Sequence, residues 1–384
     1  MKKIFVGIVT VARSDYGIYR PILNLLSQSN DFEYGLYVTG THLSYEHGYT
    51  KNEILSDGHP VLEEVDLSLS SDSAEAISKS MSICISGFGE CFGRRCPDIL
   101  MVLGDRFEMF SVAMASVPFN IPIAHIHGGE ITEGAIDNVI RHAMTKLSHI
   151  HFVSTELAAK RILQMGEAKE HIVVSGAPGL DNIKSLRLLN RSELKEKYGI
   201  PEKLFLLVTY HHVTLESGNA LLQMQSLLAA LKSTGYFVVF TSSNADLEGG
   251  AINQTINDYV EQNENALLVK NFGIEDYFGI MSHAAVMVGN SSSGIIEAAT
   301  FKLPVVNIGN RQGGRERSNN VIDVGYSKAE IERGIKEAIS DEFGKSLELC
   351  ENIYGNGDSA PIIVNKLKEL FPFKKLLTKK FNML

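Results

Sequence analysis

The sequence predicts an α/β fold made of two Rossmann-like, doubly wound domains that face a cleft. Three observations predict it: short apolar runs recur, amphipathic stretches separate them, and the alternation stops once and then restarts. Continuous apolar strands that alternate with helices are typical of parallel sheets covered on both faces. Because ligands of such sheets bind outside the carboxyl ends of the strands, we expect functional residues in the loops that follow strands.

The first half of the chain contains six apolar runs that we interpret as buried strands. These runs are residues 4–10, 34–39, 99–103, 121–125, 150–154 and 172–175. Amphipathic stretches such as 18–27 and 74–92 lie between them and have the spacing of surface helices. We therefore predict a Rossmann-like domain over residues 1–183.

A polar segment at residues 181–203, DNIKSLRLLNRSELKEKYGIPEK, separates this half from the next. Strand-like runs then restart at residues 204–210, 237–241, 266–270, 286–289 and 305–308. This pattern predicts a second Rossmann-like domain over residues 184–358. The amphipathic stretch 359–370 and the Lys-rich tail after it form a last segment, residues 359–384.

The composition fits a globular protein and argues against a nucleic-acid partner. Apolar residues make up 44 % and charged residues 21 % of the 384 residues, a length that suits two domains. The net charge of −9 has the wrong sign for a phosphate backbone, which needs clustered Lys and Arg. An anionic ligand can still bind where a few Arg residues and helix amino termini converge.

Nothing in the sequence predicts secretion, a membrane span or a metal site. The apolar run at the amino terminus stops at Arg13, too short for a signal peptide, and no apolar stretch approaches the ~20 residues that span a bilayer. The four cysteines, Cys84, Cys91, Cys96 and Cys350, lack the paired spacing of zinc ligands. We therefore expect a cytoplasmic protein with reduced thiols, no membrane partner and no bound metal.

The segment GNSSSGIIEA, residues 289–298, follows an apolar run and opens a helix. The first N–H groups of a helix, here those of Ser292, Ser293 and Gly294, are unpaired and lie at the positive end of the helix dipole, which favours a diphosphate. Glu297, one turn later, can accept hydrogen bonds from ribose hydroxyls. The same serines also fit plain capping of a helix.

Three further loops carry candidates for anion binding. Arg13 follows the first strand, and an Arg at a strand tip can reach a phosphate or form a surface ion pair. The loop NIGNRQGGRER, residues 307–317, contains Arg311 among three Arg and three Gly residues. His211 and His212 follow the first strand of the second domain, either as turn histidines or as ligands of a phosphate.

Ionisable residues gather after two strands of the first domain. Asp105 lies at a strand tip in LGDRFE, where a carboxylate is held rigidly, and the next strand leads into HIHGGEITEGAIDNVIRH. The ionisable residues of this second stretch are His125, His127, Glu130, Glu133, Asp137, Arg141 and His142. Asp137 and Arg141 share a helix face and can pair, and the histidines lack the HExxH spacing of a zinc site. We predict an acid–base cluster here.

Eight short motifs follow one another in a particular order. They are RSDYG at Arg13, GTHL at Gly40, VLGDR at Val102, HIHGGE at His125, IRHA at Ile140, SSNAD at Ser242, GNSSSGIIE at Gly289 and NIGNRQ at Asn307. The ordered set resembles the UDP-N-acetylglucosamine 2-epimerase family, in particular the hydrolysing branch used in sialic acid biosynthesis. The resemblance covers nearly the whole chain.

The resemblance implies a fold like that of the GT-B glycosyltransferases. In that fold the second domain binds the nucleotide, and a final helix, here residues 359–370, crosses back to the first domain. The resemblance also implies a nucleotide-sugar substrate, UDP as a product, a homodimer and no cofactor.

The resemblance assigns site residues as well. Nucleotide contacts carry over to Arg13, His211, Ser292, Ser293, Gly294, Glu297 and Arg311. Catalytic carboxylates carry over to Asp105 and Asp137. Some family members have Glu at the position of His127, so the acid–base role there falls on Glu130 or is shared with His127. Further candidates for substrate binding are His42, Arg141, Asp181 and Asn244.

The implied reaction is an elimination followed by hydration. Because the C2–H bond of an N-acetylglucosaminyl diphosphate is not next to a carbonyl, a base removes the proton as the C1–O bond to UDP breaks, and water adds to the glycal to give N-acetylmannosamine. Other interpretations stay open. They are the same reaction on UDP- or GDP-linked N,N'-diacetylbacillosamine for legionaminic acid biosynthesis, a non-hydrolysing epimerase, a GT-B glycosyltransferase and a non-catalytic nucleotide-sugar sensor.

Overall fold

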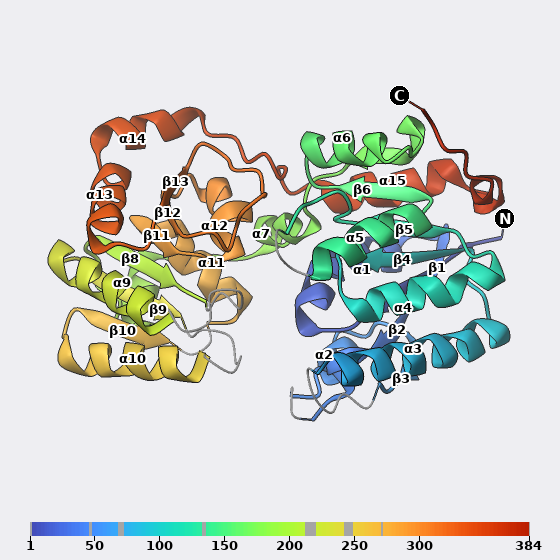
Figure 1. Cartoon of the computed structure of the whole chain (residues 1–384), viewed down its shortest axis with the longest axis horizontal. Coiled ribbons are helices and arrows are strands. Elements are labelled where there is room, and N and C mark those ends of the chain that lie inside the picture. Colours follow the sequence, from blue (N-terminus) through green and yellow to red (C-terminus); the bar gives the residue numbers. More distant parts are fainter. Residues whose placement is uncertain are drawn as a thin grey trace. The chain divides into compact units, whose positions relative to one another are not determined.

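The computed structural model describes residues 2–45, 48–67, 73–132, 136–211, 220–241, 249–269 and 272–383. The chain forms two compact units (Figure 1). Unit 1 comprises residues 1–184 and 354–384, and unit 2 comprises residues 185–353. Each unit contains one sheet whose neighbouring strands are all parallel, which confirms the predicted α/β class with two parallel sheets.

Unit 1 is built on a sheet with the strand order β3-β2-β1-β4-β5-β6-β7. The strands are β1 (Ile4–Thr10), β2 (Phe32–Thr39), β3 (Val61–Val65), β4 (Ile99–Leu103), β5 (Ile123–Ile126), β6 (Ile150–Val153) and β7 (Ile172–Val174). The helices are α1 (Arg13–Gln28), α2 (Lys51–Ser56), α3 (Ala74–Arg94), α4 (Phe107–Ser116), α5 (Ile136–Leu147), α6 (Glu156–Gln164), α7 (Asp181–Ser185) and α15 (Ser359–Leu370). The strand order reverses between β1 and β4, as in doubly wound folds.

The central strands are apolar because helices cover both faces of the sheet. Every residue of β1 and β4 is buried, so their sequences, IFVGIVT and ILMVL, show no alternation of polar and apolar residues. Gly7 in β1 leaves room for the ring of Tyr37, which would lie 2.7 Å from a Cβ atom at that position. All strands of a parallel sheet end at one side, which we call its carboxyl edge.

The carboxyl-terminal segment belongs to unit 1. Helix α15, red in Figure 1, packs against α1, and its Ile363 and Leu367 are fully buried in the core that contains β1. The carboxylate of Asp181 accepts hydrogen bonds from the start of α15, from the N–H of Ser359 at 3.0 Å and of Ala360 at 2.6 Å. The last helix is therefore a component of the first core.

Unit 2 has a second sheet of the same kind, with the strand order β10-β9-β8-β11-β12-β13. The strands are β8 (Phe205–Thr209), β9 (Phe237–Thr241), β10 (Ala266–Val269), β11 (Val286–Gly289), β12 (Val305–Ile308) and β13 (Val321–Val324). The helices are α8 (Arg191–Tyr198), α9 (Ala220–Thr234), α10 (Gly249–Gln262), α11 (Gly273–His283), α12 (Ser292–Ile296), α13 (Lys328–Ala338) and α14 (Asp341–Ser346). Here the order reverses between β8 and β11.

The sequence patterns missed one edge strand in each unit, β3 and β13. Their sequences, VLEEV and VIDV, mix charged with apolar residues, and most of their positions are only partly buried. An edge strand has a neighbour on one side only, so it needs no continuous apolar run. The missed strands lie at the margins of the sheets and do not change the central strand order.

Candidate active site

The carboxyl edge of unit 1 brings the predicted acid–base residues together. Asp105 follows β4 and accepts a hydrogen bond from the guanidinium of Arg141 on α5. The N–H of Gly104 donates to the carbonyl of Ile126 at 2.9 Å, which ties the tip of β4 to the tip of β5. Only 5 % of the Arg141 side chain is exposed. A buried cation therefore fixes the position of the Asp105 carboxylate.

Asp137 lies in the first turn of α5. Burial raises the pKa of this carboxyl group and the charge of Asp105 raises it further, while Arg106 and Arg141 act in the opposite direction. The sequence suggested a pair between Asp137 and Arg141, four residues apart, but the structure pairs Arg141 with Asp105. A carboxylic acid that holds its proton more tightly than usual suits proton transfer near neutral pH.

Sequence reasoning missed the pair formed by Arg106 and Glu108. The guanidinium donates two hydrogen bonds to the carboxylate, at 2.8 and 3.1 Å. The Glu108 side chain is completely buried, whereas 46 % of the Arg106 side chain is exposed. A buried carboxylate thus orients a solvent-facing cation next to Asp105. The available signal was in LGDRFE, where this Arg directly follows the candidate Asp.

His127 and Glu130 form a hydrogen-bonded pair in the loop after β5. Nδ1 of His127 lies 2.6 Å from Oε1 of Glu130, and the same oxygen accepts a hydrogen bond from the hydroxyl of Ser154 at 2.7 Å. His125, in contrast, is buried in β5 with its Nε2 2.8 Å from the carbonyl oxygen of Gly104. Burial lowers the pKa of His125 to about 3. His125 is therefore a neutral part of the core.

The loop after β1 presents Arg13 to solvent. Its side chain is 55 % exposed and forms an ion pair with Glu53 at 2.9 Å, one of the two roles that the sequence left open. Asp15, buried at the start of α1, accepts hydrogen bonds from the N–H groups of Val11 and Ala12. Burial raises the pKa of Asp15 to about 6 despite these bonds. The turn before α1 is therefore built around a buried carboxyl group.

His42, after β2, is enclosed by the protein. Its Nε2 lies 2.9 Å from the hydroxyl of Thr10, its Nδ1 lies 2.7 Å from the hydroxyl of Thr50, and the residue is fully buried. Burial lowers the pKa of His42 to about 4. In the structure His42 fixes the loop after β2, and its contact with a substrate stays a prediction.

Four sequence candidates from the two units remain. Asp181 caps α15, and burial raises the pKa of its carboxyl group. Its proposed substrate contact has no test in the structure. Glu133, His212 and Asn244 lie outside the described residues.

The Ser-rich turn of unit 2 starts helix α12, which is only five residues long. Ser291 caps this helix: its Oγ accepts a hydrogen bond from the N–H of Ser293 at 3.3 Å, and its carbonyl oxygen accepts one from Gly294 at 3.2 Å. The capping role that the sequence left open is therefore observed. Two of the three N–H groups proposed for a diphosphate already have a partner, so a diphosphate would compete with Ser291 for them.

Asn290 connects the nucleotide-binding candidates of unit 2. Its side-chain amide pairs with the backbone of His211: Oδ1 accepts from the N–H at 2.7 Å and Nδ2 donates to the carbonyl at 2.8 Å. The carbonyl oxygen of Asn290 accepts hydrogen bonds from Arg311 at 3.0 Å and from Gln312 at 2.8 Å. Sequence reasoning gave Asn290 no role, although GNSSSG places it between β11 and the serines.

Two partly buried side chains near the Ser-rich turn have shifted pKa values. Burial lowers the pKa of His211 to about 4, and the charge of Arg311 lowers it further. Burial raises the pKa of Tyr277, on α11, to about 12, although a hydrogen bond with Ser293 opposes this. Glu297 ends α12, where its N–H donates to the carbonyl of Ser293 at 3.0 Å. Its contact with a ribose stays a prediction.

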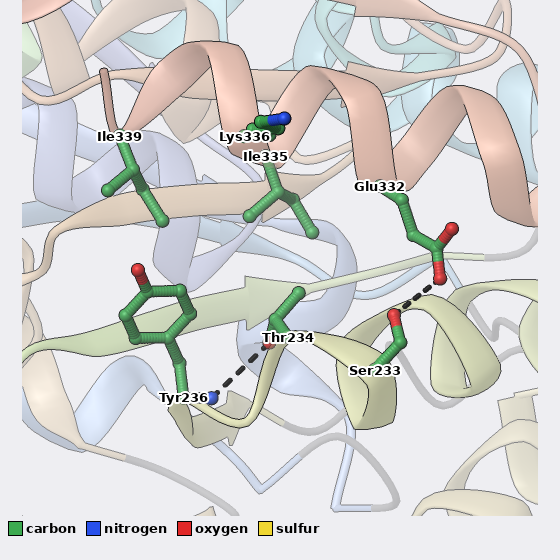
Figure 2. Close-up of a pocket in the computed structure, with 7 residues that line it drawn as sticks. All are labelled: Ser233, Thr234, Tyr236, Glu332, Ile335, Lys336 and Ile339. Atoms are coloured by element: carbon green, nitrogen blue, oxygen red, sulfur yellow. Dashed lines mark hydrogen bonds between the residues drawn. The ribbon is translucent and has the colours of Figure 1, made fainter.

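A pocket of about 440 Å³ lies elsewhere in unit 2, where the end of α9 and the start of β9 meet α13 (Figure 2). Its lining residues are Ser233, Thr234, Tyr236, Glu332, Ile335, Lys336 and Ile339. The hydroxyl of Ser233 donates a hydrogen bond to Glu332 beside the pocket. Because β9 starts there, this pocket lies at the amino end of the strands and is separate from the candidate residues.

Two features are absent from the part of the chain that the structure describes. No three His, Cys, Asp or Glu side chains are arranged so that they could hold a metal ion. No helix combines the length and apolar character needed to cross a membrane.

The geometry agrees with a comparison of the sequence with protein families. A family model described as UDP-N-acetylglucosamine 2-epimerase matches residues 24–368, which include nearly all of both sheets. The chain belongs to the UDP-N-acetylglucosamine 2-epimerase family. The family predicted from the ordered motifs is confirmed.

Relatives of this 2-epimerase family member include two proteins of similar length. A UDP-N,N'-diacetylbacillosamine 2-epimerase (hydrolyzing) from Legionella pneumophila is 37 % identical over 97 % of each chain. The polysialic acid biosynthesis protein P7 of Escherichia coli is 37 % identical over 97 % of this chain and 95 % of its own. The predictions of an enzyme and of the hydrolysing branch are thereby confirmed.

A solved structure supports the fold of this 2-epimerase family member. The UDP-GlcNAc 2-epimerase of Neisseria meningitidis, bound to UDP-GlcNAc, matches with a TM-score of 0.80 at 19 % identity, over 96 % of this chain and 100 % of that chain. The predicted GT-B-like fold is confirmed. At this level of identity the match informs the fold alone.

Proposed function

We propose that this protein is a hydrolysing 2-epimerase of a nucleotide-linked N,N'-diacetylbacillosamine, serving legionaminic acid biosynthesis. It would release the free sugar, inverted at C2, together with the nucleoside diphosphate. The observation that carries this proposal is the 37 % identity, over 97 % of each chain, to the Legionella pneumophila enzyme of that name. The ionisable groups at the carboxyl edge of unit 1 are suited to the proton transfers that the reaction needs.

The reaction proceeds by elimination because C2 of the sugar is not next to a carbonyl group. A base takes the C2 proton while the C1–O bond breaks, and the electron pair of that bond leaves with the diphosphate. The product of this step is a glycal. Hydroxide from water then adds at C1, and a proton returns to C2 on the opposite face. We propose Asp105, His127, Glu130 and Asp137 as the groups of unit 1 that serve these steps.

Unit 2 supplies groups for the departing diphosphate. Negative charge builds up on this group in the transition state, so contacts that strengthen there raise turnover. Asn290, directly before the serines of the turn, binds the backbone of His211 through its side chain and the guanidinium of Arg311 through its carbonyl oxygen. We propose the turn as a phosphate site and Glu297 as a ribose contact. Arg13 of unit 1 is a separate candidate for binding phosphate.

A second candidate substrate is UDP-N-acetylglucosamine, which the same reaction converts to N-acetylmannosamine and UDP for sialic acid biosynthesis. The equal identity to the polysialic acid biosynthesis protein P7 of Escherichia coli favours it. The two sugars differ at C4 and C6, whereas bonds break and form at C1 and C2. The proton-transfer groups therefore suit both sugars, and residues near C4 and C6 decide between them.

Product analysis in D2O tests the proposal. Purified protein is incubated with UDP- and GDP-linked N,N'-diacetylbacillosamine and with UDP-N-acetylglucosamine, and products are followed by NMR. We expect free sugar with deuterium at C2 and inverted configuration, formed fastest from a diacetylbacillosamine nucleotide. Faster turnover of UDP-N-acetylglucosamine would establish the second candidate. A C2 epimer still attached to its nucleotide would overturn hydrolysis, and product without deuterium would overturn the elimination.

We also propose that the enzyme is a homodimer, as the family resemblance implies. Light scattering of the purified protein during size-exclusion chromatography measures its mass directly. A mass of one chain at every concentration tested would overturn the dimer and leave the proposed reaction unaffected.

A further inference from the structure

In the pair formed by His127 and Glu130, the carboxylate has a second hydrogen-bond partner among the described residues and the imidazole does not. Nδ1 of His127 lies 2.6 Å from Oε1 of Glu130, an oxygen that also accepts a hydrogen bond from Ser154 at 2.7 Å. Only 9 % of Glu130 is exposed. In the part of the chain that the structure describes, the bond from Nδ1 is the only hydrogen bond of the His127 ring. The carboxylate is therefore fixed inside the protein, whereas the second ring nitrogen of the histidine stays available.

The backbone around His127 is held in an unusual conformation. His127 has a φ of +63°, in the left-handed region that costs a residue with a side chain about 1–3 kcal/mol, and residues with this strain cluster at functional sites. Gly129 follows with a φ of +75°, and a Cβ atom there would lie 2.5 Å from the carbonyl oxygen of Ala158. Arg161 donates a hydrogen bond to the carbonyl of Gly129 at 3.1 Å. The surrounding structure thus maintains the strained position of His127.

The same loop lies beside Asp105. The N–H of Gly104 binds the carbonyl of Ile126, so the residues that follow this pair, Asp105 and His127, leave neighbouring strands at the same edge. The N–H of His127 also donates to the carbonyl of Phe152 at 3.0 Å. Hydrogen bonds to both neighbouring strands therefore fix the place of His127 in the row of ionisable groups.

We propose that His127 is the general base of the elimination and that Glu130 is its positioning residue. This inference rests on the proposed function. Neutral His127 donates Nδ1–H to Glu130, which leaves the lone pair on Nε2. Nε2 forms a bond to the C2 proton, the C2–H electron pair becomes the glycal double bond, and the C1–O pair leaves with the diphosphate. The imidazolium that forms is stabilised by the Glu130 carboxylate.

The charged and titratable groups around His127 are consistent with this role. Glu130 lies on its own loop, Arg161 reaches the loop from α6, and the ring of His125 in β5 is kept neutral by burial. Arg141 on α5 is engaged with Asp105. Asp137, in the first turn of the same helix, is then the remaining carboxyl group proposed to return a proton to C2.

Three variants test the proposal on the full chain: His127→Gln, Glu130→Gln and the control His171→Gln, at a histidine of unit 1 outside the proposed machinery. We expect His127→Gln to lower kcat by roughly 10²–10⁴-fold. Glu130→Gln should lower kcat by roughly 10–10³-fold with little change in KM. It should also move the acidic limb of the kcat/KM profile to lower pH, because the imidazolium loses its carboxylate partner. The control should turn over normally.

The glycal, supplied directly, separates the two steps. His127→Gln should hydrate the glycal at close to the wild-type rate, because its defect lies before that intermediate. Turnover of the nucleotide sugar by His127→Gln above about one tenth of the wild-type rate would overturn the role of His127. An unchanged pH profile in Glu130→Gln, with UDP binding and thermal unfolding as in the wild type, would overturn the positioning role. If the wild type turned over no nucleotide sugar, the proposed function itself would fail.

Discussion

The two sheets have similar central topology but carry different chemistry at their carboxyl edges. In unit 1 the loops after β4 and β5 carry Asp105, His127 and Glu130, each paired with another side chain. In unit 2 the loop after β11 carries Asn290 and a Ser-rich turn, and their partners are mostly backbone groups. Under the proposed function, one fold thus carries proton-transfer groups in unit 1 and backbone groups for the ligand in unit 2. Substitutions in unit 1 should lower turnover, and substitutions in unit 2 should weaken nucleotide binding.

Asp105→Asn gives the largest expected effect on turnover. The amide keeps the size of the side chain but removes the charge that we propose takes part in proton transfer, so kcat should fall by roughly 10²–10⁴-fold while UDP affinity stays unchanged. Steady-state kinetics and isothermal titration with UDP measure the two quantities. The matched control is Asp98→Asn, at the amino end of the same strand, where the carboxylate accepts a hydrogen bond from the N–H of Phe5 at 3.0 Å. Normal turnover in both variants would contradict a role of Asp105 in proton transfer.

A pair of glycine substitutions compares the tips of the two central strands. Gly289 is the last residue of β11 and has a φ of +139°. A Cβ atom added there would lie 2.0 Å from the carbonyl oxygen of Thr209. Gly104 follows β4 with a φ of +72° and open space around a Cβ atom. Gly289→Ala should cost more than about 3 kcal/mol of unfolding free energy, and Gly104→Ala about 1 kcal/mol. Urea unfolding followed by circular dichroism measures both, and equal losses would contradict the expected difference.

Asn290→Ala tests whether unit 2 acts through binding. The substitution removes both hydrogen bonds to the backbone of His211, and each buried group left unpaired costs about 1–3 kcal/mol. UDP affinity should therefore fall by roughly 10–100-fold, with kcat at saturating substrate nearly unchanged. Titration calorimetry and kinetics check this. Asn320→Ala is the control, since Asn320 is also fully buried but bonds the carbonyl of Leu303. A fall in kcat with unchanged UDP affinity would contradict the proposal that unit 2 acts through nucleotide binding.

The sequence predicts single strands and loops but does not predict contacts between residues that the sheets bring together from distant parts of the chain. Central strands such as β1 and β4 are continuous apolar runs, which the sequence shows directly. The order of the elements and the loops that carry Asp105, His127 and Ser293 could therefore be predicted. Edge strands with mixed sequences were not. The family motifs then supplied roles that the patterns alone left open.

The side-chain pairs of the candidate site could not be predicted, because they join residues that are far apart in the sequence. The spacing of four residues on a helix made Asp137 a possible partner of Arg141, yet Arg141 binds Asp105, 36 residues away in the sequence. Asn290 reaches His211 across 79 residues, and Ser154 reaches Glu130 across 24. Parallel strand order creates these contacts, and no local pattern encodes them.

The smallest difference that we expect between the two units is in how much stability each loses at acidic pH. Burial lowers the pKa from 6.5 to about 4 for His42 and His149 and to about 3 for His125, all in unit 1, whereas in unit 2 His211 has a comparable value of about 4. A histidine with a lowered pKa binds fewer protons when folded than when unfolded. Its contribution to stability is therefore complete above pH 6.5 and declines as the pH falls toward the folded pKa. Asp15, whose pKa is raised to about 6, opposes this loss in unit 1.

Acidification should consequently weaken unit 1 more than unit 2. Each fully buried histidine should lose about 2 kcal/mol between neutral pH and about pH 5, and Asp15 should return about 1 kcal/mol. Hydrogen exchange, measured by mass spectrometry on peptides from β5 and β11 and corrected for the intrinsic pH dependence, reports the two units separately. We expect protection of β5 to fall further than that of β11. Equal losses would mean that the buried histidines of unit 1 are stabilised in their charged form on acidification, which would also remove the basis for treating His125 as a neutral part of the core.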